Sequence, residues 1–155
     1  MDVEVGPVEV RVGLRPSTRV EPLGVYERRG DGHTLSRHCG ESPDIEADRL
    51  EHHPQLAATG SFRDELTAQR CVEAAVAVHR GEIENWRRCS CPRLAIEHDM
   101  GEVVGDVLER RELEAGRPAP EPATAVRVIL SRTPGYRSGF AVLTAYPVLD
   151  SMAHA

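Results

Sequence analysis

The hydrophobic pattern changes character once along the chain, and this change constrains the fold more than any other feature of the sequence. Between Ser61 and about Arg88, apolar residues recur at steps of three and four, which predicts a long amphipathic helix. After the break at Cys89 to Pro92, short runs rich in Val, Ile and Leu are separated by Gly, Pro or acidic turns, which predicts strands. Helices followed by strands, without alternation, indicate an α+β domain with an antiparallel sheet. The four expected strands cover 93–97, 103–108, 124–132 and 138–146.

Two shorter helices are expected on the N-terminal side of the long one. One runs from Thr34 to Gly40, and the other starts at Ser42 and stops at Pro54. The stretch 1–30 is punctuated by Pro and Gly, so we interpret it as a leader or linker that holds at most one short strand. We therefore expect the folded domain at 31–150 and a short tail at 151–155.

Composition limits the classes of protein that the chain can belong to. Its 155 residues fit one compact domain, and we expect a monomer without a cofactor. The formal charge is −6 and all 19 basic residues are arginine, which argues against non-specific binding to nucleic acid but leaves room for a local basic cleft. In a domain of this size four cysteines do not form a disulfide framework, so we expect them reduced. No apolar run is long enough to predict a membrane span.

The segment from Asp31 to Gly40, DGHTLSRHCG, carries the most reactive chemistry in the sequence. It contains His33 and His38, and imidazole is the side chain whose ordinary pKa lies near neutrality. Both histidines are therefore candidates for general acid or base catalysis. Spacing alone does not decide between such a role and an ordinary surface position.

The end of the last expected strand offers two hydroxyl groups on one surface. Thr144 and Tyr146 point to the same face because side chains alternate across a strand. Pro147 cannot donate a hydrogen bond to a sheet, so the strand should end at a sheet edge, as at the rim of a cleft.

A zinc site is the competing interpretation of the histidines and cysteines. The candidate ligands are Cys89, Cys91, His98, Cys39, His33 and His38. Zinc sites usually use two matched pairs of ligands with wider spacing, whereas this chain has one tight CxC pair, so we expect no metal. The sequence also lacks the GxxxxGK[ST] phosphate loop and the GxSxG elbow, which disfavours nucleotide hydrolysis and serine-hydrolase chemistry.

Several phrases, in order, together resemble a known family. They are GHTLSRHCG, the pair Arg49-Leu50, SFRDELTAQRCVEAAV, TAVRVIL and SGFAVLTAYP. From about Gly32 to Pro147 the chain resembles the RNase A-like toxin domain found at the C-termini of bacterial contact-dependent growth inhibition proteins and other polymorphic toxins. The resemblance implies a pancreatic-ribonuclease-like α+β fold without the conserved disulfides. It also implies metal-independent RNA cleavage, neutralisation by a cognate immunity protein, and action in the target-cell cytoplasm after delivery by a system outside this sequence.

The resemblance also implies which residues form the site. The family pattern has a histidine in HTLxRHxG, an arginine on the following helix, and the threonine and tyrosine of the terminal TAYP-like strand. Carried over, these are His38, Arg49, Thr144 and Tyr146. His33 is the competing assignment for the histidine. Cys39 departs from the family, which often has an aliphatic residue there.

RNA cleavage needs a base for the 2′-hydroxyl, donors for the phosphate oxygens and an acid for the departing 5′-oxygen. His38 is the natural base, and the planar fork of Arg49 suits a phosphate. The acid is either Tyr146 or His33. We further expect Arg37, Arg49 and Thr144 to contact the substrate.

The sequence therefore predicts a metal-independent endoribonuclease toxin that leaves 2′,3′-cyclic phosphate ends. One alternative is a catalytically inactive binding module of the same fold. The other is a zinc-binding domain that uses Cys89 and Cys91.

Overall fold

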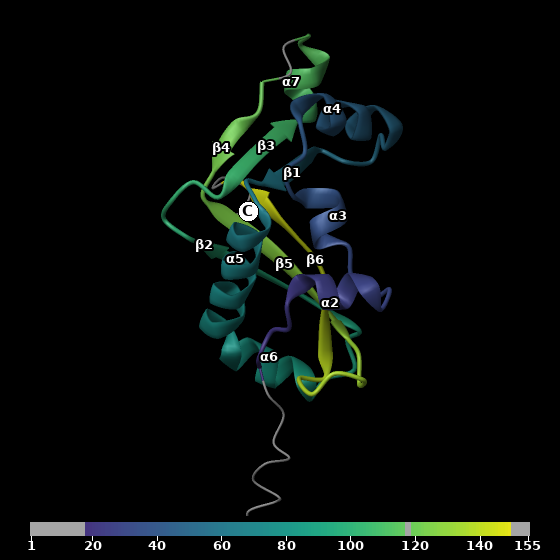
Figure 1. Cartoon of the computed structure of the whole chain (residues 1–155), viewed down its shortest axis with the longest axis vertical. Coiled ribbons are helices and arrows are strands. Elements are labelled where there is room, and N and C mark those ends of the chain that lie inside the picture. Colours follow the sequence, from purple (N-terminus) through teal and green to yellow (C-terminus); the bar gives the residue numbers. More distant parts are fainter. Residues whose placement is uncertain (1–17, 117–118, 150–155) are drawn as a thin grey trace, which may run out of the picture.

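The computed structural model describes residues 18–116 and 119–149, and it has the expected α+β architecture (Figure 1). The helices are α2 (Leu23–Arg28), α3 (Thr34–His38), α4 (Pro43–His52), α5 (Glu65–Val78), α6 (Arg80–Arg87) and α7 (Arg110–Glu114). The strands are β1 (Ala58–Phe62), β2 (Arg93–Asp99), β3 (Gly105–Glu109), β4 (Glu121–Ala123), β5 (Ala125–Arg132) and β6 (Phe140–Val148). They form two antiparallel three-stranded sheets, with strand orders β1-β3-β4 and β2-β5-β6. In the described part of the chain, no helix is long and apolar enough to cross a membrane.

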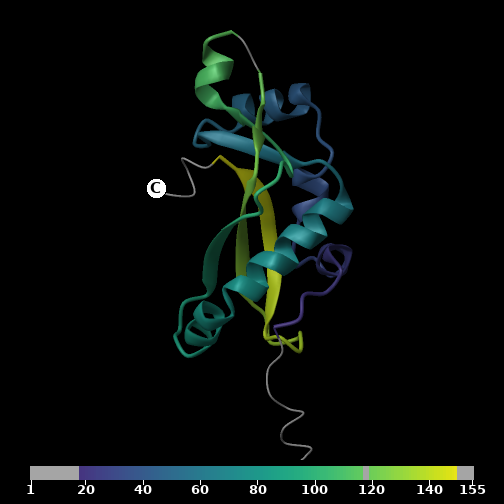
Figure 2. The same ribbon diagram turned by 90° about the vertical axis from the view of Figure 1, so that its left-hand side faces the viewer.

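The larger sheet separates the main core from an open surface. Helix α5 runs diagonally across one face of this sheet (Figure 2). On that face Val126, Val128 and Leu130 of β5 are completely buried and belong to the same apolar cluster as Val72 of α5. The other face, which we call the polar face, carries partly exposed side chains, among them Arg127 and Ser131 of β5, because successive residues of a strand alternate between faces. This polar face is the one available for a site.

Local signals in the sequence set the end of α3 and the start of α4. Gly40 follows α3 with φ +68°, a conformation that glycine adopts without steric cost. Ser42 caps α4, because its hydroxyl accepts a hydrogen bond from the Ile45 N–H at 3.3 Å. The start of α3 is capped from outside: the carboxylate of Glu27 on α2 accepts hydrogen bonds from the backbone N–H groups of Leu35 and Ser36.

The expected long helix is wrong at its start. Ser61 and Phe62 belong to β1, where they pair with Asp106 and Gly105 of β3. The helix begins instead after Asp64, whose carboxylate accepts a hydrogen bond from the Thr67 N–H at 2.8 Å. At its other end the helical segment divides into α5 and α6 at His79. Phe62 fitted the helical apolar stripe, but it enters the core from a strand that a distant part of the chain completes.

The expected leader also differs from the structure over residues 18–30. Leu23 and Tyr26 of α2 are 2% and 1% exposed and lie in the core cluster of the domain. The Tyr26 ring packs edge-on against Tyr136, with ring centroids 5.1 Å apart. The folded domain therefore starts before residue 31. The remaining leader, 1–17, and the tail expected at 151–155 lie outside the described residues.

Candidate active site

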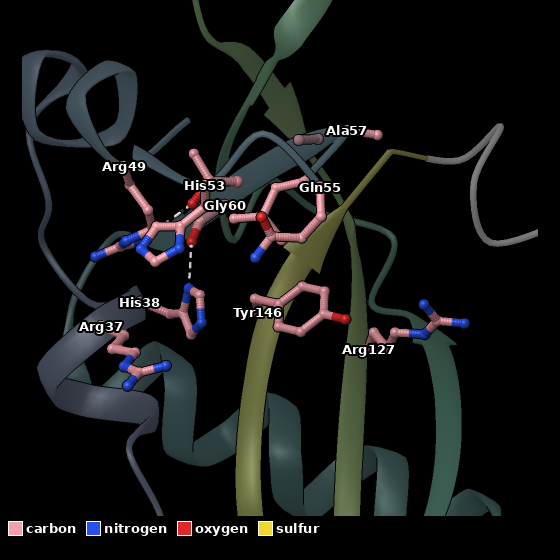
Figure 3. Close-up of a pocket in the computed structure, with 12 residues that line it drawn as sticks. Arg37, His38, Arg49, His53, Gln55, Ala57, Gly60, Arg127 and Tyr146 are labelled. Atoms are coloured by element: carbon pink, nitrogen blue, oxygen red, sulfur yellow. Dashed lines mark hydrogen bonds between the residues drawn. The ribbon is translucent and has the colours of Figure 1, made fainter. Parts of the chain in front are cut away.

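A cavity of about 560 Å³ opens between α3, α4, β1 and the polar face of the larger sheet (Figure 3). Of the residues proposed from sequence, it brings together Arg37, His38, Arg49 and Tyr146. The lining also contains His53, Gln55 and Arg127, which sequence reasoning missed. The cavity therefore joins residues from the first third of the chain to the last strands.

His38, the last residue of α3, is held in a defined tautomer. Its Nδ1 lies 2.9 Å from the carbonyl oxygen of Gly60 on β1. A carbonyl oxygen only accepts hydrogen bonds, so Nδ1 carries the proton and Nε2 keeps its lone pair. Gly60 also packs closely against β6. It can do so because it has no side chain, since a Cβ there would lie 2.5 Å from the backbone oxygen of Pro147. The contact between β1 and β6 thus fixes the atom that orients the imidazole.

The surroundings keep His38 uncharged at neutral pH. Burial lowers its pKa to about 4, and the positive charge of Arg49 acts in the same direction. The hydrogen bond to Gly60 opposes this shift but does not overcome it. His38 therefore offers a neutral, oriented base.

Arg49 projects from α4 and is fixed before any substrate arrives. One of its terminal nitrogens lies 3.2 Å from a carboxylate oxygen of Glu41, and the other donates to the hydroxyl of Thr59 at 3.2 Å. The Arg49 and Glu41 side chains are each only 17% exposed. A guanidinium held in this way keeps a set orientation for an anion in the cavity.

Tyr146 and Thr144 occupy the edge strand β6, and they share a face as expected. The Tyr146 ring packs against His38, with ring centroids 5.2 Å apart. Thr144 is 8% exposed and does not line the cavity. Its hydroxyl has no hydrogen-bond partner within residues 18–116 and 119–149. Tyr146 therefore faces the cavity, whereas Thr144 is a buried polar group behind it.

His33 lies next to the cavity but does not line it. Its ring centroid is 6.3 Å from that of His38. Its backbone N–H donates to the Leu143 carbonyl oxygen at 3.0 Å, which ties the start of α3 to β6. Burial, followed by the charge of Arg37, lowers the pKa of His33. The placement favours His38 over His33 as the residue that meets a substrate.

The three missed residues had no clear local signal. His53 resembled a solvent-exposed helix end, and Gln55 lies in the short connection between α4 and β1. Arg127 lies on β5 directly opposite Tyr146. Strand alternation alone puts Arg127 on the face away from the core, but only the pairing of β5 with β6 places it beside the cavity.

The geometry gives the zinc alternative no support. Among the residues that the structure describes, no group of three or more His, Cys, Asp or Glu side chains is arranged to hold a metal ion. Cys89 and Cys91 are exposed, with the Cys91 N–H 3.4 Å from the Cys89 sulfur. All four cysteines are free thiols, as expected.

These features define an α+β domain with a basic, histidine-containing cavity on the open face of an antiparallel sheet. The family model described as "Bacterial CdiA-CT RNAse A domain" matches residues 32–147. The chain belongs to this family of ribonuclease toxin domains of bacterial contact-dependent growth inhibition, as the sequence resemblance indicated.

A solved structure has the same fold. It is the crystal structure of a CdiA-CT/CdiI complex from Y. kristensenii 33638, with a TM-score of 0.67 and 23% sequence identity. The match covers 76% of this chain and 99% of the other. No curated protein matches the chain.

Proposed function

We propose that this domain is a metal-independent endoribonuclease that cleaves RNA through attack of a 2′-hydroxyl on the adjacent phosphate, leaving 2′,3′-cyclic phosphate ends. The observation that carries this proposal is the hydrogen bond from His38 Nδ1 to the Gly60 carbonyl oxygen. It leaves Nε2 of a neutral imidazole unprotonated in a cavity that Arg49 and Tyr146 also line. An intramolecular attack of this kind needs such a base, and it needs no metal-bound water.

In the proposed reaction, His38 Nε2 takes the proton of the 2′-hydroxyl as the bond from O2′ to phosphorus forms. The bond from phosphorus to O5′ breaks, and the 5′-oxygen receives a proton as it leaves. Arg49 donates to the non-bridging oxygens, on which negative charge accumulates. A donor in this role contributes ~2.7 to 4 kcal/mol to lowering the barrier.

Tyr146 is the acid in this mechanism. It lines the cavity and packs against the base, whereas His33 does not line it. His53 also lines the cavity and is the alternative proton donor. Loss of the general acid lowers the cleavage rate mainly for substrates with a poor leaving group, which must be protonated as it departs. Tyr146→Phe should therefore slow cleavage of RNA far more than cleavage of an aryl phosphodiester, and His53→Gln should give this pattern instead if His53 is the acid.

Arg37, Arg49 and Thr144 are the proposed substrate contacts. Arg37 lies at the exposed end of α3, where it adds positive charge to the cavity mouth. The unpartnered hydroxyl of Thr144 suits a hydrogen bond to phosphate or base, because buried polar groups normally have partners. A shift of β6 or of its neighbours on substrate binding would be needed to bring this group into contact.

The proposed partners are RNA and a cognate immunity protein. In the Y. kristensenii structure the CdiA-CT domain is in complex with CdiI. We extend this arrangement to the present chain, with delivery into a target cell by a contact-dependent growth inhibition system and action on RNA in the cytoplasm. The unbound domain is expected to be monomeric.

The proposal is tested with purified protein and end-labelled RNA in excess EDTA. Cleavage should persist, and the products should carry 2′,3′-cyclic phosphates. His38→Ala should lower the rate by ~10²-fold or more, as for loss of a general base. His52→Ala is the matched control, because His52 is an exposed histidine on α4 outside the cavity. RNA binding without cleavage would instead support the inactive module.

A further inference from the structure

We propose that Arg127 binds a second phosphate of the RNA, the one next to the phosphate that is cleaved. This inference rests on the proposed function, because it extends the same site along the substrate. It assigns the polar face of the larger sheet as the surface that selects RNA chains over dinucleotides.

The placement of Arg127 follows from the register of the sheet. Arg127 is paired with Tyr146 on one side and with Glu97 of β2 on the other. The three side chains therefore form one row across the polar face, perpendicular to the strands. At the Tyr146 end this row meets His38, whose ring packs against Tyr146. Arg127 thus lies one strand beyond the proposed acid.

Two arginines flank the cavity from opposite sides. Arg49 lies beside His38 on the helical side, and Arg127 lies across Tyr146 on the sheet side (Figure 3). The Tyr146 ring lies between His38 and Arg127 (Figure 3), so Arg127 faces a different part of the cavity from the His38 and Arg49 side. RNA carries one phosphate per nucleotide, so a chain that continues past the cleaved position brings a further phosphate toward Arg127.

The guanidinium of Arg127 is only partly engaged in the unbound protein. Its Nε lies 3.1 Å from a carboxylate oxygen of Glu97, and the side chains are 43% and 23% exposed. This contact is an ion pair and not a hydrogen bond, because the buried Nε makes no hydrogen bond in the described part of the chain. The 3.1 Å contact with Glu97 is made through Nε rather than through the terminal nitrogens. They are the atoms that bind a phosphate in a two-point contact.

Glu97 competes with RNA for the same charge. In the unbound state it holds Arg127 against the sheet, and a phosphate must compete with its carboxylate. Removing that carboxylate should therefore strengthen RNA binding, whereas removing Arg127 should weaken it. This pair of opposite effects separates an RNA contact from a merely structural ion pair.

The first experiment compares two substrates, a dinucleoside monophosphate and a tetranucleotide with the same central step. Wild-type protein should have a higher kcat/KM for the tetranucleotide. In Arg127→Ala the tetranucleotide advantage should fall about tenfold, the factor for one lost charge-assisted hydrogen bond. Arg127→Lys should restore part of it. Arg70→Ala is the control, because Arg70 also pairs with a glutamate but lies on α5, outside the cavity.

The second experiment measures binding rather than cleavage, with a 2′-O-methyl RNA oligomer that lacks the attacking hydroxyl. Arg127→Ala should reduce the slope of log Kd against log salt by about 0.7, the value for one phosphate contact in a single strand. Glu97→Gln should tighten binding about two- to fivefold, as for loss of an exposed ion pair.

Equal losses of Arg127→Ala on both substrates, or an unchanged salt slope, would overturn the second phosphate site. Weaker binding by Glu97→Gln would overturn it as well, since both residues would then support structure. If wild-type protein cleaves neither substrate, the proposed function fails, but the binding experiment still reports on Arg127 by itself.

Discussion

Two ionisable groups on neighbouring helices, a half-buried histidine and a fully buried glutamate, show how differently this fold treats a charge. His38 of α3 and Glu46 of α4 are both held in their neutral forms at pH 7, because burial lowers the pKa of His38 to about 4 and raises that of Glu46 to about 9. His38 gives its one N–H to the Gly60 carbonyl. Glu46 is completely buried, and within the described residues neither of its oxygens has a hydrogen-bond partner.

The neutral imidazole of His38 and the neutral carboxyl group of Glu46 differ in the chemistry open to them. His38 in its neutral state is satisfied on one nitrogen and reactive on the other, so burial creates a base. Glu46 lies against Asp106 of β3, whose Oδ1 also lacks a partner in that part of the chain, and the second carboxylate adds to the rise in pKa. Two neighbouring carboxylates repel each other when both are charged, so the pair is stable only while one of them keeps a proton. In the proposed mechanism, burial makes His38 a usable base, whereas at Glu46 it only costs stability.

The largest expected effect separates the two groups by activity. His38→Ala should lower RNA cleavage by ~10²-fold or more, because the base is lost. Glu46→Gln should leave cleavage within about twofold, because an amide keeps the shape of the protonated acid. Initial rates on one labelled RNA, with folding of each variant checked by circular dichroism, measure both. A strong loss of activity in Glu46→Gln would show that Glu46 also controls the position of Arg49, one turn further along α4.

His38 should make the domain less stable in acid. The pKa of His38 is lower in the folded state than its ordinary value of 6.5, so the unfolded chain binds more protons between these two values. Stability should therefore fall as the pH drops from 6.5 to about 4, by about 3 kcal/mol from this residue. Urea unfolding across this range should show a smaller fall in His38→Gln than in the wild type. An equal fall in both would contradict the low pKa.

Glu46 should act in the opposite direction. Its folded pKa is raised, so the native state holds a proton that the unfolded state loses, and stability should decrease as the pH rises from 4.5 to about 9. Glu46→Gln should remove this decrease and stabilise the domain at pH 8 by ~1 to 3 kcal/mol, the cost of a buried unsatisfied polar group. Unfolding midpoints at pH 6 and pH 8 for both proteins give the answer. A variant that keeps the wild-type dependence on pH would rule out Glu46 as its source.

Thr144 should show the weakest effect. Like the carboxyl group of Glu46, its hydroxyl has no hydrogen-bond partner among the described residues, but Thr144 lies beside the candidate site. Thr144→Val keeps the shape and removes the polar group. It should stabilise the protein by ~0.5 to 1.5 kcal/mol, and it should lower kcat/KM several-fold if the hydroxyl meets the substrate. A gain in stability without a loss of activity would make Thr144 a structural residue only.

Local signals in the sequence predicted the helical half of the site. Gly40 and Ser42 act within a few residues, and they set the end of α3 and the start of α4 that carry His38 and Arg49. The alternation along β6 correctly put Thr144 and Tyr146 on one face. These features depend only on neighbouring residues, so they can be read without the fold.

The features that were missed depend on distant partners. Ser61 and Phe62 read as the start of a helix because β1 exists only through its pairing with β3. Arg127 became a site residue only through its register with Tyr146. No local signal marks Glu46, whose pKa is raised first by burial in the fold and then by the approach of Asp106 on β3. Tertiary pairing of this kind leaves no mark in a local pattern.

Imidazole ¹⁵N NMR of His38 is the sharpest test of whether this residue is a neutral base with its proton on Nδ1. The chemical shifts of the two ring nitrogens identify the tautomer, and their titration gives the pKa. We expect a neutral ring protonated at Nδ1 at pH 7, with a pKa of about 4. A ring protonated at Nε2, or a pKa that stays near 6.5, would contradict it.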